Sequence, residues 1–519
     1  MKLIKILTDK IQIKSNDSDF VKCHINDLIK ISDGETTLVT MISALTDTDA
    51  EQPLEDDDFL SGIQTPSVKN IECNIIGSIV DGRFTNSIDH YPITAVTANL
   101  IDSAEFSEML QSKGADECFC IGNYSSYNTP AYINGNKLYQ RHSCIVGNTG
   151  SGKSETLAKI IEETASATNC NIIIFDIHGE YSGLSYADSI KMGEVPFPIW
   201  MLGFSDMVTN LLKVKEDSTV AMSALRKAYY HQCQQHGNEN KPVWYGFNRM
   251  LTYIRGLNEE TVGTGEFYKT GDKAGQEKTK QGDYNGKLSG IVNSMDTLLK
   301  DKRYEFLFKD YSEDYLELFL NRIMGGGKPV KNIDLSGIPH DIAVLIIGAI
   351  TKLIYNIQIM QKDAQPITLV CDEAHVYIPT DFQLSASQRR MVEIFENIAK
   401  EGRKFGITLM VASQRPSELN KTIMAQCANY IVMKLNNEND KTMMKGVMAE
   451  GSSGVIESTT MFSPGDCIVI GDAAPIPLKI HVELAKERPH SRTIDFWTDW
   501  QQERKNVDYV ELLEEYLEN

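Results

Sequence analysis

Arg141-His-Ser-Cys-Ile-Val-Gly-Asn-Thr-Gly-Ser-Gly-Lys-Ser-Glu-Thr156 is the stretch of sequence that decides the fold of this chain. Within it, Gly147 to Ser154 matches the phosphate-binding pattern G-x-x-x-x-G-K-[ST] at every required position. Glycines let such a loop wrap closely around phosphate oxygens, so that successive backbone N–H groups point at the anion. Lys153 adds a positive charge toward the β- and γ-phosphates, and the Ser154 hydroxyl is a ligand for Mg²⁺.

The residues on either side of the loop favour the same interpretation. Ser143 to Val146 is typical of a short buried strand, and Glu155 to Ala165 of a helix whose N-terminus faces the anion. We therefore predict a nucleotide site in an α/β fold with a mainly parallel central sheet. The residues expected to hold the nucleotide are Gly147, Asn148, Thr149, Gly150, Ser151, Gly152, Lys153, Ser154, Glu155 and Thr156.

Composition limits the class of protein further. The 519 residues allow roughly three domains or two larger ones, and 42% hydrophobic residues are ample for buried cores. A net charge of -20 argues against a surface coated in basic residues, so any nucleic-acid surface must be local, as in a pore or groove. The N-terminus is too charged for a signal peptide, and the longest apolar run, Ile342 to Ile350, is too short for a membrane span. We expect a soluble cytoplasmic protein without a membrane partner.

The N-terminal region is predicted to form a small β-barrel or sandwich. Lys2 to Ile13, Leu38 to Ala44 and Asn70 to Phe84 are rich in β-branched residues with partial alternation. Between them lies the acidic run Asp47 to Asp58, which we interpret as a solvated loop because its carboxylates are not spaced for metal coordination.

A second buried strand follows the phosphate loop in Asn171-Ile-Ile-Ile-Phe-Asp176-Ile-His-Gly-Glu180-Tyr181. Four apolar residues that end in Asp and a glycine turn are typical of a central parallel strand, whose carboxyl end faces the ligand crevice. Asp176, His178 and Glu180 are therefore expected near the nucleotide. For Asp176, capping of the turn and a catalytic role are both open.

Residues 204–330 are predicted to be a mostly helical insertion. Ser218 to Gln235 is expected to be helical, whereas 260–290 is rich in Gly, Lys, Thr and Gln and is predicted to be a long mobile loop. Lysines and acids nearly balance in this loop, which offers little support for DNA binding. The predicted division is a barrel-like domain at 1–90, a helical connector at 91–115, an ATPase core at 116–203 and 331–490, the insertion at 204–330, and a C-terminal tail at 491–519.

An apolar strand that ends in two acids, Pro366-Ile-Thr-Leu-Val-Cys-Asp372-Glu373-Ala374-His375, has the form of a Walker B motif. Asp372 is expected to hold Mg²⁺ through its water shell, and Glu373 to polarise the attacking water. A strand with two terminal acids is common, but it becomes specific when it occurs together with the phosphate loop.

The last signal is Ile398 to Pro416, in which a helix ends in Gly-Arg403-Lys and a buried strand then delivers Ser-Gln414-Arg415 to the crevice. Gln414 is expected to orient water or to sense the γ-phosphate. Arg403 and Arg415 are both candidates to stabilise charge on the transferring phosphoryl oxygens. For Arg403 the alternative is a cation that satisfies the helix dipole.

Taken together, G-N-T-G-S-G-K-S, F-D-I-H-G-E-Y, V-C-D-E-A-H, K-E-G-R-K-F-G and V-A-S-Q-R-P resemble the motifs of the HerA branch of the HerA/FtsK superfamily. The resemblance covers residues 116–485 and implies a RecA-like ATPase that assembles as a hexamer and pumps double-stranded DNA through a central pore. It also implies that residues 1–90 are a HAS-type barrel, that Arg403 acts in trans, and that Arg141 contacts a nucleotide. It implies ATP and Mg²⁺ as ligands.

The same resemblance implies a partner, because family members commonly work with a separate nuclease or other effector enzyme docked on the N-terminal face of the ring. Bacterial examples act in DNA-end processing and anti-phage defence. This chain carries no second catalytic constellation, so the effector is expected to be another chain. Two classes remain open: a ring-shaped DNA motor, and an ATPase scaffold or switch that regulates an effector without processive movement.

The C-terminal tail is unusually apolar for a chain end. Thr493 to Trp500 contains three large aromatic residues, and from Val507 the apolar residues follow helical spacing among acids. Such a tail is expected to pack, either on its own subunit or on a neighbour. The family resemblance favours a neighbour.

Overall fold

The computed structural model describes the chain except for residues 35, 50–66, 81, 89, 93–95, 111–116, 216, 236–245, 310–312, 381–383, 385, 448–452, 491–495, 503–506 and 519. Most of the acidic run predicted to be a loop, Asp47 to Asp58, therefore lies outside the described residues. The chain divides into two compact units. Unit 1 contains Met1–Asn169, Glu373–His375 and Thr408–Arg488, and unit 2 contains Cys170–Asp372, Val376–Ile407 and Pro489–Asn519.

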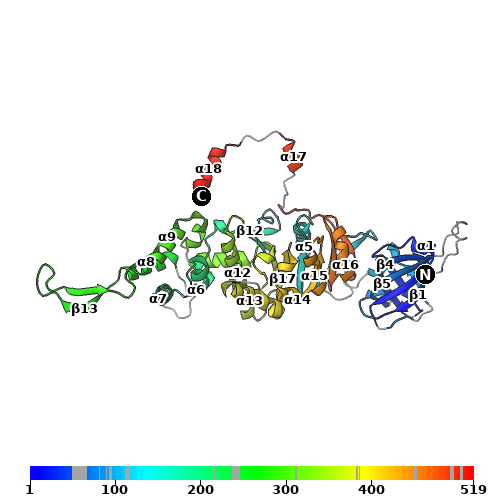
Figure 1. Ribbon diagram of the computed structural model, residues 1–519, viewed down its shortest axis with the longest axis horizontal. Helices are drawn as coiled ribbons and strands as arrows, with labels where there is room; N and C mark the ends of the chain where they lie inside the picture. The colour runs from blue at the N-terminus through cyan, green and yellow to red at the C-terminus, as the bar shows by residue number, and fades with distance from the viewer. Residues whose placement is uncertain are drawn as a thin grey trace. The chain divides into compact units, whose positions relative to one another are not determined.

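Unit 1 begins with a closed six-stranded β-barrel (Figure 1). Its strands pair in the order β2-β1-β7-β3-β4-β5, and β2 pairs with β5 to close the ring. Alternation explains the barrel, because Ile11 and Ile13 of β2 point into the same core as Ile29, Ile31 and Ile71. The elements are β1 Lys2–Ile6, β2 Lys10–Ser15, α1 Asp17–Phe20, β3 Leu28–Ser32, β4 Thr37–Asp49, β5 Ser67–Val80, β6 Arg83–Thr85 and β7 Thr97–Leu100.

The range predicted as a helical connector, 91–115, holds two different elements. β7 pairs with β1 and β3 and so completes the barrel, and only α3 at Ser103–Leu110 is helical among the described residues. Thr97-Ala-Asn-Leu100 is short and has one buried side chain, Ala98, so its sequence carries little periodicity.

The rest of unit 1 contains the strand that leads into the phosphate loop. β10 (His142–Val146) is buried at every residue and lies between two parallel strands, β17 (Ile407–Ser413) and β18 (Cys427–Val432). Antiparallel strands extend the sheet from β18 in the order β19, β20, β8, β9. The remaining elements are β8 Cys118–Tyr124, β9 Thr129–Asn134, α4 Gly135–Tyr139, α5 Lys153–Ala167, η8 Pro416–Glu418, α14 Lys421–Gln426, α15 Glu438–Val447, α16 Ser453–Ser458, η10 Thr459–Met461, β19 Asp466–Gly471 and β20 Lys479–Val482.

Unit 2 contains four parallel strands in the order β12-β15-β11-β16. β11 (Ile172–Asp176), β15 (Val330–Asp334) and β16 (Ile367–Cys371) are buried at every residue, as expected for parallel strands covered on both faces. β12 is Ala187–Lys191. The predicted α/β P-loop fold class, with its mainly parallel sheet, N-terminal barrel and helical insertion, is confirmed.

The apolar helix α12 (His340–Met360) belongs to the core of unit 2. Among the described residues it is the one helix long and apolar enough to cross a membrane, but 61% of its apolar window is buried inside the protein. Burial of this kind is typical of a core helix, which passes the same test of length and composition.

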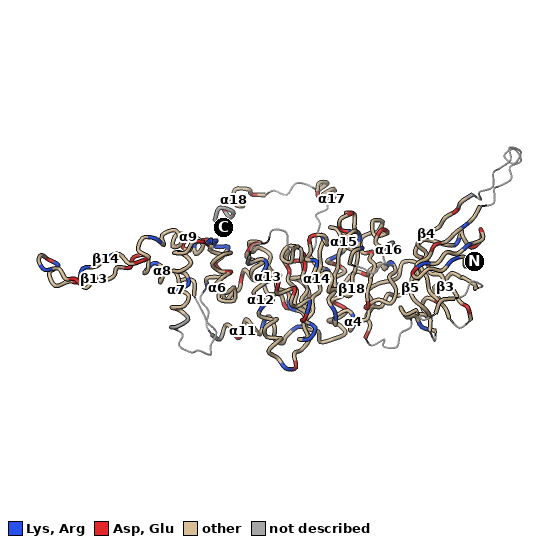
Figure 2. The backbone as a smooth tube through the Cα atoms, turned by 60° about the horizontal axis from the view of Figure 1, so that its bottom comes forward, with Lys and Arg blue, Asp and Glu red and all other residues tan. Residues whose placement is uncertain are grey.

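The insertion is mostly helical, with one exception that corrects the sequence-based prediction. Residues 260–290 are not a long loop: β13 (Thr261–Phe267) and β14 (Glu277–Gln281) form an antiparallel hairpin beyond α8 and α9 (Figure 1). Every residue of β13 is exposed, and acids and lysines alternate along the ribbon (Figure 2). Two short helices, η2 Met192–Glu194 and η3 Ile199–Leu202, precede the insertion. The helices of the insertion are α6 Gly203–Asp206, the π-helix η4 Met207–Leu211, α7 Thr219–Gln235, α8 Phe247–Asn258, α9 Ser289–Lys300, η5 Lys302–Tyr304, α10 Glu305–Phe308 and α11 Glu313–Met324.

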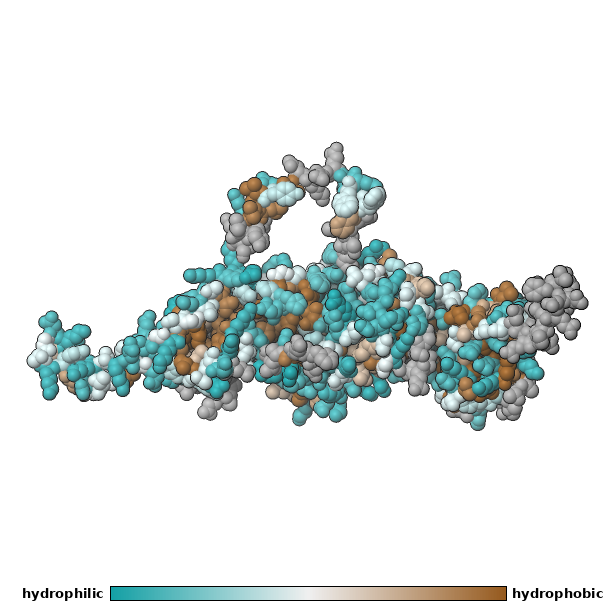
Figure 3. Space-filling view, viewed as in Figure 1, coloured by the Kyte–Doolittle hydropathy of each residue, from teal (hydrophilic) through white to brown (hydrophobic). Residues whose placement is uncertain are grey.

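The last elements of unit 2 include the exposed C-terminal helices α17 (Phe496–Trp500) and α18 (Tyr509–Glu518). Trp497 and Trp500 are each 73% exposed, and Figure 3 shows apolar side chains on α18. The chain itself therefore does not bury these aromatic rings. The other elements of this part are α13 Ala386–Glu401 and η7 Gly402–Phe405. The short helix η6 Ala374–Val376 begins within the Glu373–His375 segment of unit 1.

Candidate active site

The phosphate loop lies between the carboxyl end of β10 and the first turn of α5, and its glycines are required by its geometry. Gly150 and Gly152 have φ angles of 76° and 93°, which L-residues with a side chain rarely adopt. At Gly147 a Cβ atom would lie 2.7 Å from Cβ of Met433. Replacement of any of these glycines by a larger residue would therefore force the loop to change.

Backbone hydrogen bonds hold the loop in place. Gly147 N donates to Ser413 O at 3.3 Å, Asn148 N donates to Lys434 O at 3.0 Å, and Ser151 O accepts from Gly465 N at 2.9 Å. The loop thus contacts the carboxyl ends of β17 and β18, which flank β10, and the residue that precedes β19. α5 begins at Lys153, and its N-cap Gly152 has no side chain to occupy the first-turn N–H groups. A narrow glycine-lined loop at an uncapped helix N-terminus fits a phosphate chain.

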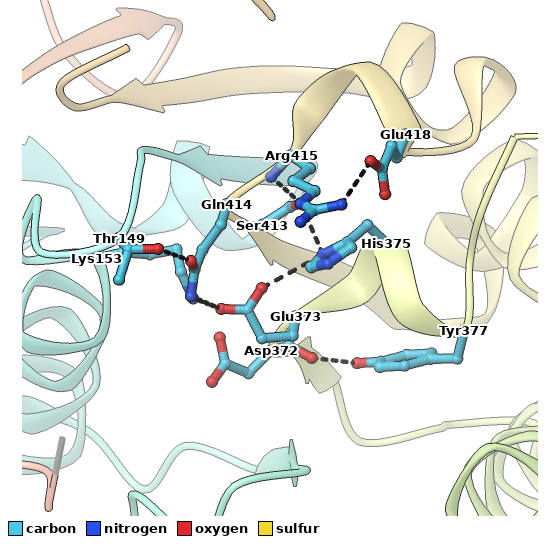
Figure 4. A network of polar contacts seen from close by, with 10 residues as sticks. All are labelled: Thr149, Lys153, Asp372, Glu373, His375, Tyr377, Ser413, Gln414, Arg415 and Glu418. Atoms are coloured by element: carbon cyan, nitrogen blue, oxygen red, sulfur yellow. Dashed lines mark hydrogen bonds and ion pairs between the residues drawn. The ribbon is translucent and has the colours of Figure 1, made fainter. Parts of the chain in front are cut away.

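Lys153, Glu373 and Gln414 are brought together in unit 1, although they lie far apart in the sequence (Figure 4). Oε1 of Glu373 lies 2.9 Å from Nζ of Lys153, and both side chains are only 5% exposed. The same oxygen accepts a 2.6 Å hydrogen bond from Nε2 of Gln414. Oε1 of Gln414 in turn accepts from the hydroxyl of Thr149 in the loop. Lys153, which would bind phosphate, is therefore paired with Glu373, which would activate water.

The electrostatics of Glu373 follow from these contacts. Burial alone would raise the pKa of Glu373, but the ion pair with Lys153 and the hydrogen bond from Gln414 outweigh it, and the pKa is lowered. The carboxylate is consequently ionised at neutral pH, as a general base must be. Its backbone has a φ of 46°, in the left-handed region that a glutamate seldom occupies.

The side chains of His375 and Ser413, for which the sequence predicted no role, complete this cluster. Nδ1 of His375 lies 3.3 Å from Oε2 of Glu373 and 3.2 Å from Oγ of Ser413. Burial lowers the pKa of His375, which keeps the ring neutral near pH 7. The sequence did contain a signal, since His375 follows Glu373 by two residues and Ser413 precedes Gln414 directly.

Asp372, the predicted magnesium residue, directly follows β16 and is only 2% exposed. Its backbone oxygen accepts a 3.1 Å hydrogen bond from the hydroxyl of Tyr377, which fixes the start of the turn that carries Glu373. Ser154 lies in the first turn of α5 and is partly exposed. A carboxylate and a hydroxyl are oxygen donors of the type that Mg²⁺ prefers.

Asp176 caps the turn that follows β11. Its carboxylate accepts hydrogen bonds from N of Glu180 at 3.0 Å, N of Tyr181 at 2.9 Å and Nδ2 of Asn332 at 3.2 Å. Burial, together with the charge of Asp372, raises the pKa of Asp176 to about 6 in spite of these bonds. Of the two roles left open, the contacts are those of turn capping.

The three candidate arginines differ in position. Arg415 directly follows Gln414 and forms an exposed 2.9 Å ion pair with Glu418. Arg141 and Arg403 instead precede the amino ends of their strands, β10 and β17, whereas the phosphate loop and Gln414 follow the carboxyl ends. Arg141 is half exposed and lies 3.8 Å from Asp472, and Arg403 is exposed.

The chain is similar to several known proteins. Residues 119–354, which include the phosphate loop, match the family model described as "Helicase HerA, central domain". The chain is 25% identical over 386 residues to a probable helicase of Methanocaldococcus jannaschii, over 72% of this chain and 69% of the relative. It is 24% identical over 482 residues to the DNA double-strand break repair helicase HerA of Sulfolobus acidocaldarius, over 90% of each chain. Among solved structures, VirB4 of Thermoanaerobacter pseudethanolicus is similar with 13% identity and a TM-score of 0.48, over 71% of this chain and 97% of that one.

Proposed function

We propose that this chain, a HerA-like P-loop ATPase, uses ATP hydrolysis to translocate double-stranded DNA. The observation that supports the proposal is the contact of Glu373 with both Lys153 and Gln414, in which a carboxylate and an amide lie beside the phosphate loop. The match to the HerA central domain supports DNA as the substrate of the movement.

Each residue of the site takes one role in this proposal. Lys153 and the loop N–H groups hold the β- and γ-phosphates, and Ser154 and Asp372 hold Mg²⁺. The metal ion, when bound, neutralises part of the phosphate charge. Glu373 accepts a proton from the attacking water, and Gln414 orients that water or senses the γ-phosphate.

A head-to-tail hexamer is the assembly that these positions support. β10 has five residues and β17 has seven, so roughly 15–20 Å of extended strand separate Arg141 and Arg403 from the site at the carboxyl ends. Neither arginine is therefore placed to reach the nucleotide of its own chain. In a ring with heterologous contacts, the amino edge of one subunit faces the site of the next, and Arg403 then acts in trans on its phosphates.

The proposal extends to partners and surroundings. With a net charge of -20, DNA contacts must be confined to a local surface such as the ring pore. A separate nuclease or other effector, as in a defence system, docks on the N-terminal barrel, and the exposed tail braces a neighbouring subunit in the cytoplasm. Support for the docking comes from large apolar residues exposed on the barrel, namely Ile4, Leu7, Val21, Ile25 and Val80.

The test is ATP hydrolysis by the full chain with and without double-stranded DNA, together with displacement of a protein roadblock from that DNA. The motor requires DNA-stimulated turnover and displacement, and both should disappear in Lys153→Ala and Glu373→Gln. A scaffold or switch would give a different result. DNA would not change the rate of ATP hydrolysis, and the activity of the effector would depend on which nucleotide is bound.

A further inference from the structure

His375 occupies a place between the Walker B turn and the end of the neighbouring strand β17. Figure 4 shows its ring between the side chains of Glu373 and Ser413. The 3-10 turn Ala374–Val376 folds the chain back directly after Glu373, so a residue two positions later can reach the carboxylate. The His375 side chain is 17% exposed and Ser413 is fully buried, so the contacts form largely out of water.

The position of the proton on His375 follows from its neighbours. Oγ of Ser413 already accepts a 3.0 Å hydrogen bond from N of Arg415, and it can accept one more. Oε2 of Glu373 belongs to an ionised carboxylate, which only accepts. An unprotonated Nδ1 would direct its lone pair at this oxygen, and the two would repel each other. A neutral ring has one N–H, and the tautomer that carries it on Nδ1 avoids this repulsion.

The two oxygens of Glu373 therefore have different partners. Oε1 is bound by Lys153 and Gln414, and Lys153 is the group that the phosphates would engage. Oε2 faces Nδ1 of His375, which has no part in phosphate binding. Among the described residues Oε2 makes no hydrogen bond, and Nδ1 of His375 lies 3.3 Å from it. When Lys153 turns to phosphate, Oε1 loses its cation, whereas Nδ1 of His375 stays within reach of Oε2.

We infer that His375 is a positioning residue for Glu373, in that its Nδ1–H holds Oε2 while Oε1 is released to face the attacking water. Ser413, fixed by N of Arg415, limits the rotation of the imidazole ring. The inference rests on the proposed role of Glu373 as the base. Without His375 the carboxylate of Glu373 would still be ionised, but it would not be oriented toward the attacking water.

Three substitutions separate a donor at Nδ1 from a ring that only fills space. Asn at 375 places its amide nitrogen close to the position of Nδ1, whereas Gln places it near the position of Nε2. Ala removes both donors. All three substitutions remove the imidazole ring. If the ring only filled space, the Asn variant would therefore have no higher kcat than the Gln variant.

The experiment is steady-state ATP hydrolysis by the full chain, with the affinity for a non-hydrolysable ATP analogue measured in parallel. His375→Ala should lower kcat about tenfold to a hundredfold, the value of a hydrogen bond to a charged group, with the analogue bound within about threefold of wild type. His375→Asn should keep most of the wild-type kcat, and His375→Gln should resemble the Ala variant.

Opposite outcomes would overturn the inference. A His375→Ala variant with kcat within twofold of wild type would do so, as would equal impairment of the Asn and Gln variants. If the Ala variant does not fold, the inference is tested by comparing kcat of the Asn variant with kcat of the Gln variant. Glu373→Gln in the same assay keeps the two proposals apart: an active Glu373→Gln overturns the base itself, whereas an inactive one beside an active His375→Ala overturns only the role of His375.

Discussion

Replacement of Glu373 by Gln should abolish turnover and, at the same time, tighten nucleotide binding. Nζ of Lys153 is held 2.9 Å from Oε1 of Glu373, and both side chains are only 5% exposed. A phosphate that takes Lys153 must break this buried ion pair. Part of the binding free energy is therefore spent on separating two residues of the protein itself.

The size of the effect can be worked out from the contact. Hydrogen bonds to charged groups contribute about 1.5–3 kcal/mol. The Lys153–Glu373 pair, in which both groups are charged, lies at the upper end of this range, and a bond from the Lys153 ammonium to the amide oxygen of Gln lies at the lower end. The difference, about 1–1.5 kcal/mol, corresponds to about fivefold to tenfold tighter binding. Loss of a positioned base lowers kcat by about 10²–10⁴.

Calorimetric titration with both ADP and a non-hydrolysable ATP analogue is the suitable assay. Removal of a negative charge near the γ-phosphate would favour the triphosphate alone, whereas release of Lys153 favours both nucleotides because lysine also reaches the β-phosphate. Glu418→Gln is a matched control. Its carboxylate pairs with Arg415 at 2.9 Å on an exposed surface, so this change should leave both affinities unaltered.

The reasoning fails if Glu373→Gln binds ADP with wild-type affinity or more weakly. That result would mean that the ion pair with Lys153 does not compete with phosphate. Wild-type turnover by the same variant would remove Glu373 from the role of base.

Three further predictions follow from other parts of the chain. Between about pH 4 and pH 6 folded Asp176 keeps a proton that the unfolded chain has lost, because its pKa rises from 3.8 to about 6. Wild-type stability relative to Asp176→Asn should therefore fall by about 1–2 kcal/mol from pH 5 to pH 7.5 in thermal unfolding. Arg403→Ala should bind ATP and lose about 10³–10⁵ in hydrolysis, and mixing it with Glu373→Gln should restore some activity. Deletion of residues 491–519 should leave circular dichroism of the ATPase core intact but reduce the mass of the assembly in light scattering.

Each of these has a clear contrary result. A stability difference between wild type and Asp176→Asn that is independent of pH would contradict the raised pKa. Failure of every mixture to regain activity, with subunit exchange demonstrated, would count against a trans role for Arg403. An intact assembly after loss of the tail would refute the brace.

The sequence predicts the local parts of the site well because their chemistry is local. Gly147, Gly152 and Lys153, the residues that define the phosphate loop, lie within eight positions of sequence, and β10 and α5 lie where the pattern predicts them. The contact of Lys153 with Glu373 is different. It depends on strands that join in space across more than two hundred residues, and on a left-handed φ at Glu373 that no propensity predicts.

The hairpin β13–β14 shows why the sequence was misread elsewhere. Periodicity detects a strand by one buried face, and β13 has none, since all seven of its residues are exposed. Backbone pairs such as Val262 with Lys280, together with side-chain contacts such as the 3.1 Å ion pair of Lys278 with Glu266, hold the ribbon together. Glycine and lysine in such a segment resemble the composition of a loop, although the two strands pair on both sides of an irregular stretch between Gly263 and Phe267.

The backbone of Glu373 connects the site to a change of state. A non-glycine residue at a φ of 46° costs about 1–3 kcal/mol, and it persists only where surrounding contacts stabilise it. Here those contacts are Lys153 and Gln414 on one carboxylate oxygen and His375 on the other. When phosphate removes Lys153, the strain stays while part of its compensation is lost. The proposed motor thus has, at the residue that activates water, a conformation whose stability depends on whether nucleotide is bound.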